Sequence, residues 1–352
     1  MSAAPFDHPF LSGLLGDEEV SALFSAQADV EAMISFEIAL AAAEAEAGVI
    51  PAEAGRAIGD ALSQFVPDMD ALRVGTARDG VVIPSLVAMM RKAVGDTYGS
   101  KVHFGATSQD VIDTSLALRL KALSSVLSSR LSAVIKLLEE IEARDGSIET
   151  MGHTRMQAAI PVPAARKIAS WKDPLVRLRD KLDEATRGVA VLSFGGAAGT
   201  LEKLGDEGAE VSRLLAQRLG LQAPERARHS ERDGVAGFAS CLSLLTGSLG
   251  KMGQDIALLA QNEVAEIKLA AGGGSSAMPH KVNPVGAETL VALARFNATL
   301  VAGMHQSLVH ENERSGAAWT LEWMLLPQMA VATATSLRTA ATLLPAVSFN
   351  RK

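Results

Sequence analysis

Residues 111–144 read VIDTSLALRLKALSSVLSSRLSAVIKLLEEIEAR, a run that contains neither proline nor glycine. Apolar side chains recur along it at steps of three and four, the spacing of one helix face, at Leu116, Leu120, Leu123, Leu127, Leu131, Val134 and Leu138. As a single α-helix the run is about 50 Å long at 1.5 Å per residue. A rod of this length buries its apolar stripe only against neighbours of similar length, so the run predicts a helix bundle.

Four other segments have the length of such neighbours. Helices are expected over about 163–192, with a kink or break at Pro174, over 233–269, over 284–310 and over 319–344. In the second of these, Val264 and Ile267 still follow the helical phase. Glycine and proline divide the first hundred residues into shorter helices. We therefore predict an all-α protein, with a helical N-terminal domain over 1–100 and a long-helix bundle over 101–352.

Composition restricts the partners and the compartment. A net charge of -7 with scattered basic residues argues against a nucleic-acid partner. Glu37, Glu44 and Glu322 interrupt the most apolar stretches, so we expect no segment that crosses a membrane. The single cysteine, Cys241, permits no internal disulfide, and the first basic residue is Arg56, so no export signal is expected. These features predict a cytoplasmic protein, and the dispersed histidines predict no metal site.

Polar segments that interrupt the predicted helices are the candidates for chemistry, because loops on a rigid scaffold carry most functional groups. They are HFGATSQD at 103–110, GHTRMQ at 152–157, GGGSSAMPHKVNP at 272–284 and ENERSGAAW at 311–319. Each has a simpler interpretation: Thr107 or Ser108 caps a helix, Arg155 and Arg314 are surface cations, and the glycines form a linker. The glycine-rich segment lacks the spacing of a phosphate loop, and FGGAAGT at 194–200 follows no strand pattern, so a turn or close helix approach explains it better than nucleotide binding.

Three of these segments, in this order, resemble the three signature regions of the fumarase/aspartase superfamily: GATSQD at 105–110, GHTRMQ at 152–157 and GSSAMPHKVNP at 274–284. Within the superfamily the sequence is most similar to bacterial 3-carboxy-cis,cis-muconate cycloisomerases. The stretches that support this are PFDHPF at 5–10, FGGAAGTL at 194–201 and ERSGAAW at 313–319, which is followed by Glu322 and Trp323.

The resemblance implies a fold, an assembly and a set of site residues. The fold is a homotetramer around a shared bundle, with active sites built from signature regions of different subunits and without cofactor or metal. Ser275 is implied as the base for the carbon-bound proton, with catalytic roles also for Lys281, Arg155 and Glu288. Contacts to a tricarboxylate substrate are implied for Thr107, Ser108, Thr154, Gln157, Ser276, Met278, Asn283 and Arg314. The implied reaction converts 3-carboxy-cis,cis-muconate to 4-carboxymuconolactone in protocatechuate (β-ketoadipate) catabolism.

Two departures from the superfamily pattern bear on this reaction. The second region of the lyases usually has His where this chain has Arg155. The group that departs when the lactone reopens is a carboxylate, already a stable anion at pH 7 with a pKa near 4. It needs no proton donor, and a fixed cation orients it, so Arg155 is compatible with a cycloisomerase and awkward for a fumarase. The chain also ends early, so the family's third helical domain is expected to be reduced or absent.

Two alternatives remain at this point. Residues 103–110 also suit an adenylosuccinate lyase or a related lyase of the superfamily, against which Arg155 and the short C-terminus speak. A catalytically silent helical scaffold is the other, against which the intact Ser275, Lys281 and Asn283 speak.

Overall fold

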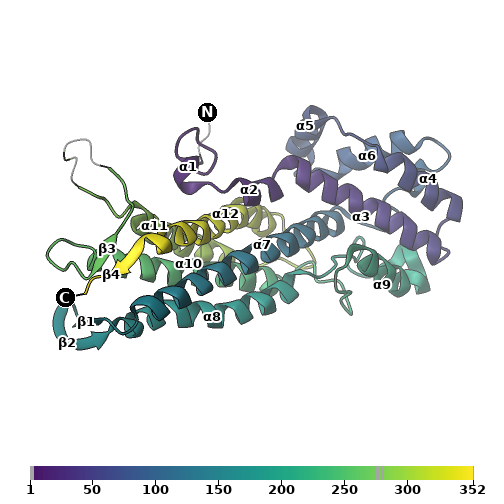
Figure 1. The fold of residues 1–352 in the computed structure, drawn as a ribbon. Coiled ribbons are helices and arrows are strands. Elements are labelled where there is room, and N and C mark those ends of the chain that lie inside the picture. Colours follow the sequence, from purple (N-terminus) through teal and green to yellow (C-terminus); the bar gives the residue numbers. More distant parts are fainter. Residues whose placement is uncertain (1–3, 275–277, 279–280, 352) are drawn as a thin grey trace.

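The computed structural model describes residues 4–274, 278 and 281–351. Most of these residues lie in helices, as predicted. Five long helices run side by side as a bundle (Figure 1). They are α7 (Ser108–Asp145), α8 (Ala164–Val189), α10 (Asp233–Leu259), α11 (Val285–Gln306) and α12 (Ala317–Leu343).

The predicted apolar stripe of α7 forms the spine of the bundle core. Leu123, Leu127, Leu131, Val134 and Leu138 are all fully buried, as their spacing predicts. Across from them lie leucines of α8 and α10 in the same hydrophobic cluster. The helix α8 continues through Pro174, so the predicted break is absent there.

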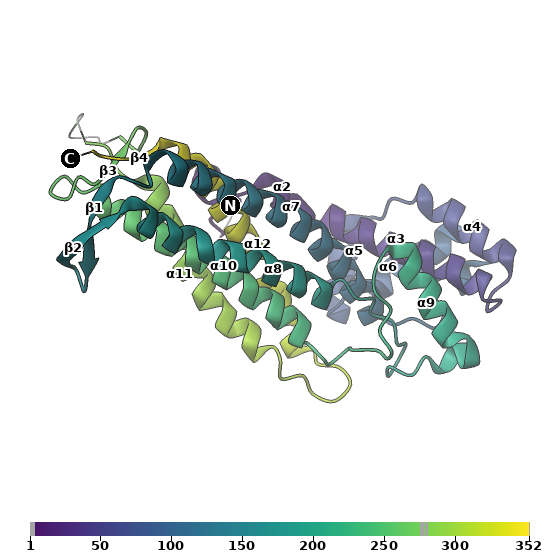
Figure 2. The same cartoon turned by 60° about the horizontal axis from the view of Figure 1, so that its bottom comes forward.

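A second hydrophobic cluster lies at one end of the bundle. It is built from α3 (Ala26–Glu46), α4 (Ala52–Ser63), α5 (Met69–Asp79) and α6 (Ile83–Val94), with the shorter α1 (Ser12–Leu15) and α2 (Glu18–Leu23) leading in. From later in the chain α9 (Gly208–Leu219), after the 3-10 turn Glu202–Glu207, packs against α3 (Figure 2). The first turn of α7 enters the same cluster through Val111 and Ile112. The N-terminal helices are therefore anchored on the start of the longest helix.

The segment predicted as one helix over 233–269 ends ten residues early. Helix α10 stops at Leu259, and β3 (Ile267–Leu269) pairs with β4 (Val347–Phe349) from the end of the chain. Between them Ala265 has a positive φ of 47°, and the buried Glu266 accepts a hydrogen bond from the Met151 backbone N–H at 2.6 Å. Pairing between residues eighty apart decides this segment, so the helical phase of Val264 and Ile267 was misleading.

The prediction that no segment is long and apolar enough to span a membrane is wrong. By length and composition alone, α10 and α11 both meet that criterion. The glutamates on which that prediction relied lie in α3 and α12 instead. In α10, 56% of the most apolar window is buried, as in a core helix, but in α11 only 28% is buried within the chain. Much of the surface of α11 therefore faces outward.

Candidate active site

The third signature region is closed at its base by backbone pairing. Gly273 and Asn283 exchange two hydrogen bonds of 2.9 and 2.8 Å, and the Asn283 side-chain amide donates to the Gly274 carbonyl at 3.0 Å. A Cβ at Gly273 would lie 2.4 Å from the Val285 side chain, so glycine is required for this approach. Ser275 and Ser276, predicted as base and substrate contact, lie outside the described residues.

A cavity of about 750 Å³ opens beside the paired residues Gly273 and Asn283. Met278, Lys281 and Asn283 line it together with the turn after α10, at Gln261 and Glu263. The Lys281 side chain is exposed, and within the described part of the chain no carboxylate forms an ion pair with it. Three of the predicted residues therefore share one hollow that offers a cation and an amide to an anion.

Glu288 lies in the first turn of α11, just after this cavity, and its side chain is exposed. It continues a row of exposed residues along the outward face of the helix, formed by Glu288, Ala292, Arg295, Ala298 and Ala302. Mostly small side chains in such a row let another helix approach closely.

The second signature region forms the tip of a β-hairpin, not a polar loop between helices. Strands β1 (Glu149–Thr154) and β2 (Gln157–Pro163) pair antiparallel, and Arg155 and Met156 make the two-residue turn with φ of 48° and 67°. Positive φ at both positions is the mark of the turn that suits strand twist best. Residues 153–161 are all exposed, so within one chain Arg155 is a surface cation, as its simpler interpretation held.

The first signature region begins α7. Thr107 is the N-cap, and its backbone N–H donates to the Asp110 side chain at 2.9 Å, which confirms the predicted cap. Thr107 and Ser108 are half-buried. Asp110 also accepts hydrogen bonds from the backbone N–H groups of Gly195 and Gly196 at 2.9 and 3.0 Å and contacts His229 at 2.7 Å. This fully buried carboxylate ties the start of α7 to the 194–201 turn.

Arg314, predicted as a clamp for a substrate carboxylate, lies beside this first region. Its Nε donates to the Gln109 side-chain oxygen at 2.9 Å, and Nη2 donates to the Ala197 carbonyl at 3.3 Å. Gln109 is fixed in this orientation, because its amide nitrogen donates to Asp113 at 3.0 Å and to the His229 carbonyl at 2.8 Å. All these partners of Arg314 are neutral, so its positive charge is available to an anion.

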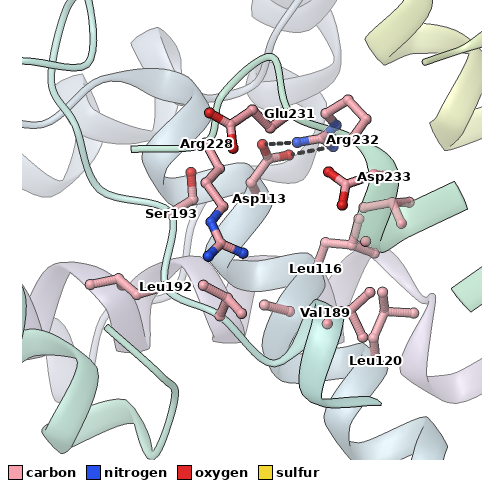
Figure 3. Close-up of a pocket in the computed structure, with 15 residues that line it drawn as sticks. Asp113, Leu116, Leu120, Val189, Leu192, Ser193, Arg228, Glu231, Arg232 and Asp233 are labelled. Carbon is pink, nitrogen blue, oxygen red and sulfur yellow. Dashed lines mark hydrogen bonds and ion pairs between the residues drawn. The ribbon is translucent and has the colours of Figure 1, made fainter. Parts of the chain in front are cut away.

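A buried ionic cluster, which the sequence analysis missed, lies next to Gln109 and includes its partner Asp113. Arg232 lies between Asp113, at 2.6 Å, and Glu322, and the Trp319 ring N–H donates to Asp113 at 3.0 Å. Burial works to lower the pKa of Arg232, but the two carboxylates outweigh it and raise that pKa. Figure 3 shows the Asp113–Arg232 pair at a small cavity of about 70 Å³, with Arg228 and Glu231 at its edge. The sequence gives little signal for it, since Asp110 and Asp113 lie among other polar residues in the segment SQDVIDTS at 108–115.

As far as their described residues go, the three signature regions do not all meet within one chain. The first lies at the start of α7, whereas the second follows its end, after 38 residues that span about 57 Å at 1.5 Å each. The third lies with β3 and β4 at the end of the bundle that also carries the β1–β2 hairpin, away from α3–α6 and α9 (Figures 1 and 2). Thr107, Ser108 and Arg314 are thus separated from Lys281 and Arg155 by the length of the bundle.

Comparison with known proteins gives this arrangement a family. A family model described as Lyase matches residues 17–297. The chain is 40% identical to a 3-carboxy-cis,cis-muconate cycloisomerase of Pseudomonas aeruginosa over 92% of this chain and 72% of that protein. It is 39% identical to one of Bradyrhizobium diazoefficiens over 94% and 74% of the two chains. The crystal structure of the 3-carboxy-cis,cis-muconate lactonizing enzyme from Pseudomonas putida superposes with a TM-score of 0.90 at 34% identity, over 97% of this chain and 77% of that one.

The sequence relatives and the solved structure each cover more than nine tenths of this chain, and the range matched by the family model includes the three signature regions. The chain therefore belongs to the lyase family of the fumarase/aspartase superfamily, in which it resembles the bacterial 3-carboxy-cis,cis-muconate cycloisomerases.

Proposed function

We propose that this protein is a 3-carboxy-cis,cis-muconate cycloisomerase, an intramolecular lyase that forms 4-carboxymuconolactone. The observation that carries the proposal is the state of Arg155: an exposed cation at a hairpin tip, paired with no carboxylate among the described residues. Relatives with the cycloisomerase name at 36–40% identity support it. An arginine matches a carboxylate that adds and departs as an anion, whereas an amine or hydroxide leaving group benefits from a proton donor.

In the proposed reaction one carboxylate oxygen of the substrate adds to the conjugated double bond, and a proton is delivered to the neighbouring carbon. One C–O bond and one C–H bond form at the expense of the π bond. In the reverse direction Ser275 takes that proton, and the electrons pass into the adjacent carboxylate as a doubly charged aci-carboxylate. In this proposal Lys281 and Asn283 stabilise this charge, and the loss of one donor of this kind costs about 3 kcal/mol.

The site is proposed to form between subunits of a homotetramer. Two observations support this: the bundle's length separates the first region from the other two, and the outward face of α11 is mostly uncovered within one chain. In this assembly Thr107, Ser108 and Arg314 of one chain face Lys281, Asn283 and Met278 of another. The hairpin residues Arg155, Thr154 and Gln157 come from a third, with Arg155 near Glu288 across an interface. No cofactor enters the proposed reaction, which takes place in the cytoplasm.

The test is to incubate the purified protein with 3-carboxy-cis,cis-muconate, without added metal or nucleotide. We expect loss of the substrate's ultraviolet absorbance and formation of the lactone. Adenylosuccinate is the matched alternative, and fumarate release from it without lactone formation would identify a different lyase of the superfamily. Inactivity toward both would refute the proposed function.

Ser275→Ala tests the assigned base. We expect turnover to fall by at least two orders of magnitude, as for a removed acid–base group, while the oligomer persists. Turnover near that of the unmodified protein would overturn the assignment, and size-exclusion chromatography with light scattering checks the assembly.

A further inference from the structure

A cavity of about 290 Å³ lies at the junction between the N-terminal helices and the bundle, outside the candidate active site. Its walls come from the segment after α2, from α3, α5, α7 and α12, and from the two residues before α6. The apolar and aromatic residues that line it are Phe24, Met33, Val81, Val82, Ile112, Leu116, Trp323, Leu326 and Pro327. An adjoining hollow of about 460 Å³ shares Asp29, Met33, Thr76 and Val82 with it, so it lies next to the cavity on the side of α5.

One ion pair provides most of the polarity of this cavity. The Arg119 guanidinium contacts Asp29 at 2.8 Å through Nη2, and only 12% of the Arg119 side chain is exposed. The same Asp29 oxygen already accepts a hydrogen bond from the Ser115 hydroxyl at 2.6 Å. Arg119 Nε donates only a long bond of 3.3 Å to the Ser115 carbonyl, and the Phe24 ring centroid lies 5.7 Å from its guanidinium carbon. The Ser115 hydroxyl is a neutral donor, so Asp29 remains the carboxylate that pairs with Arg119, while Nη1 of Arg119 has no hydrogen-bond partner among the described residues.

The electrostatics agree with this geometry. Burial lowers the pKa of Arg119 more than the attraction of Asp29 raises it. A further anion within hydrogen-bond distance of such a buried cation stabilises its charged form through charge-assisted hydrogen bonds. The other charged group on the cavity wall, Glu322, is already paired with Arg232 and faces the ionic cluster.

We propose that this cavity is a second binding site, specific for a small apolar monocarboxylate, such as an aromatic or branched-chain acid. The carboxylate pairs with Arg119, and the hydrocarbon part lies between Phe24, Leu326 and Trp323. The volume suits a molecule with a single ring. A tricarboxylate is disfavoured here, because the cavity wall offers one guanidinium, already paired with Asp29, and additional negative charges would remain unpaired beside apolar walls.

Occupancy of this site bears on the first signature region through α7. Ile112 and Leu116 line the cavity one and two turns after Ser108, on the same helix. A bound acid would brace the N-terminal helices against the start of α7 and the middle of α12. The binding itself does not depend on the proposed catalytic function, so either can fail alone.

The experiment is a titration of the assembled protein with 4-fluorobenzoate, followed by fluorine NMR, with 4-fluorotoluene as the uncharged control. We expect saturable binding of the acid and at least tenfold weaker binding of the toluene, since a charged hydrogen bond is lost. Leu326→Trp fills the cavity and keeps the charge, whereas Arg119→Met keeps the volume and removes it. Each is expected to weaken binding at least tenfold, and Arg56→Met on the exposed face of α4 is the control that leaves it unchanged.

Three results would overturn the proposal: no saturable binding by the unmodified protein, equal binding of 4-fluorotoluene, or affinity that Leu326→Trp and Arg119→Met both leave unchanged. Loss of binding in Arg314→Met with full binding in Leu326→Trp would place the acid at the candidate active site and also refute it. Circular dichroism and light scattering show that each variant is folded and assembled.

Discussion

Glu44 is expected to make the protein less stable as the pH rises, and Glu44→Gln is expected to remove this effect. The side chain is fully buried on α3, and neither carboxylate oxygen has a hydrogen-bond partner among the described residues. Burial raises its pKa from 4.5 to about 9, repulsion from Glu37 adds to the rise, and attraction from Lys101 opposes it. The Glu37 carboxylate contacts His103 instead, with 2.6 Å between Oε1 and Nδ1. Glu44 is therefore a neutral acid in the folded protein at pH 7.

The magnitude follows from the difference in proton binding between the two states. Below pH 4.5 both folded and unfolded chains hold the proton, so Glu44 adds no pH dependence. Between pH 4.5 and about 9 only the folded chain holds it, so stability falls by about 1.4 kcal/mol per pH unit. At pH 7 this amounts to about 3 kcal/mol, or about 4 °C in Tm for a chain of this length. Above about pH 9 the loss levels off.

The assay is thermal unfolding from pH 5 to pH 9 for the unmodified protein, Glu44→Gln and the control Glu31→Gln, which lies exposed on the same helix. A neutral amide needs no proton uptake, so Glu44→Gln is expected to gain stability relative to the unmodified protein as the pH rises. The Glu31→Gln curve is expected to follow the unmodified one. Parallel curves for Glu44→Gln and the unmodified protein over this range would refute the reasoning.

Three further outcomes are expected. Arg314→Met removes the cation beside Gln109, so KM in the lactonization assay should rise about 10- to 100-fold with a smaller change in kcat, as for a lost charged hydrogen bond; an unchanged KM would exclude it as a clamp. Asp110→Asn replaces the buried carboxylate that accepts hydrogen bonds from two backbone N–H groups and contacts His229. Chemical unfolding should show that the free energy of unfolding falls by about 2–4 kcal/mol. A fall below about 1 kcal/mol would show that these contacts are dispensable for stability. Ala298→Arg places a long charged side chain on the outward face of α11 and should shift the proposed tetramer to smaller species in light scattering. An oligomer of unchanged size would remove that face from the proposed interface.

The bundle could be predicted because its pattern is local and long. In α7 the leucines of the buried face recur at steps of three and four residues, and no glycine or proline interrupts the run over 111–144. The end of α10 could not be predicted, since Ile267 pairs with Phe349, and local phase carries no information on a partner eighty residues away. The Arg155–Met156 turn was also hidden, because it adopts positive φ without the glycine or asparagine that usually marks such turns.

Of the candidate site, too, one part could be predicted from the sequence and another part could not. The signature segments predicted the site residues, and the structure places Met278, Lys281 and Asn283 at one cavity and Arg314 beside Gln109. The buried cluster of Asp113, Arg232 and Glu322 joins three distant segments, and single charged residues in a sequence do not reveal their partners. The positions of Ser275 and Ser276 lie outside the described residues, so their roles remain predictions.

The central claim is that each active site combines the first region of one chain with the third region of another, and complementation between inactive variants tests it most directly. Ser275→Ala disables the third region, and Arg314→Asp reverses the charge beside the first. Co-expressed in equal amounts, the two chains should form mixed oligomers in which about a quarter of the sites combine an intact Ser275 with an intact Arg314, and lactonization should return to about that fraction. If the mixed oligomers form and remain as inactive as either variant alone, both residues act within one chain and the shared site is contradicted.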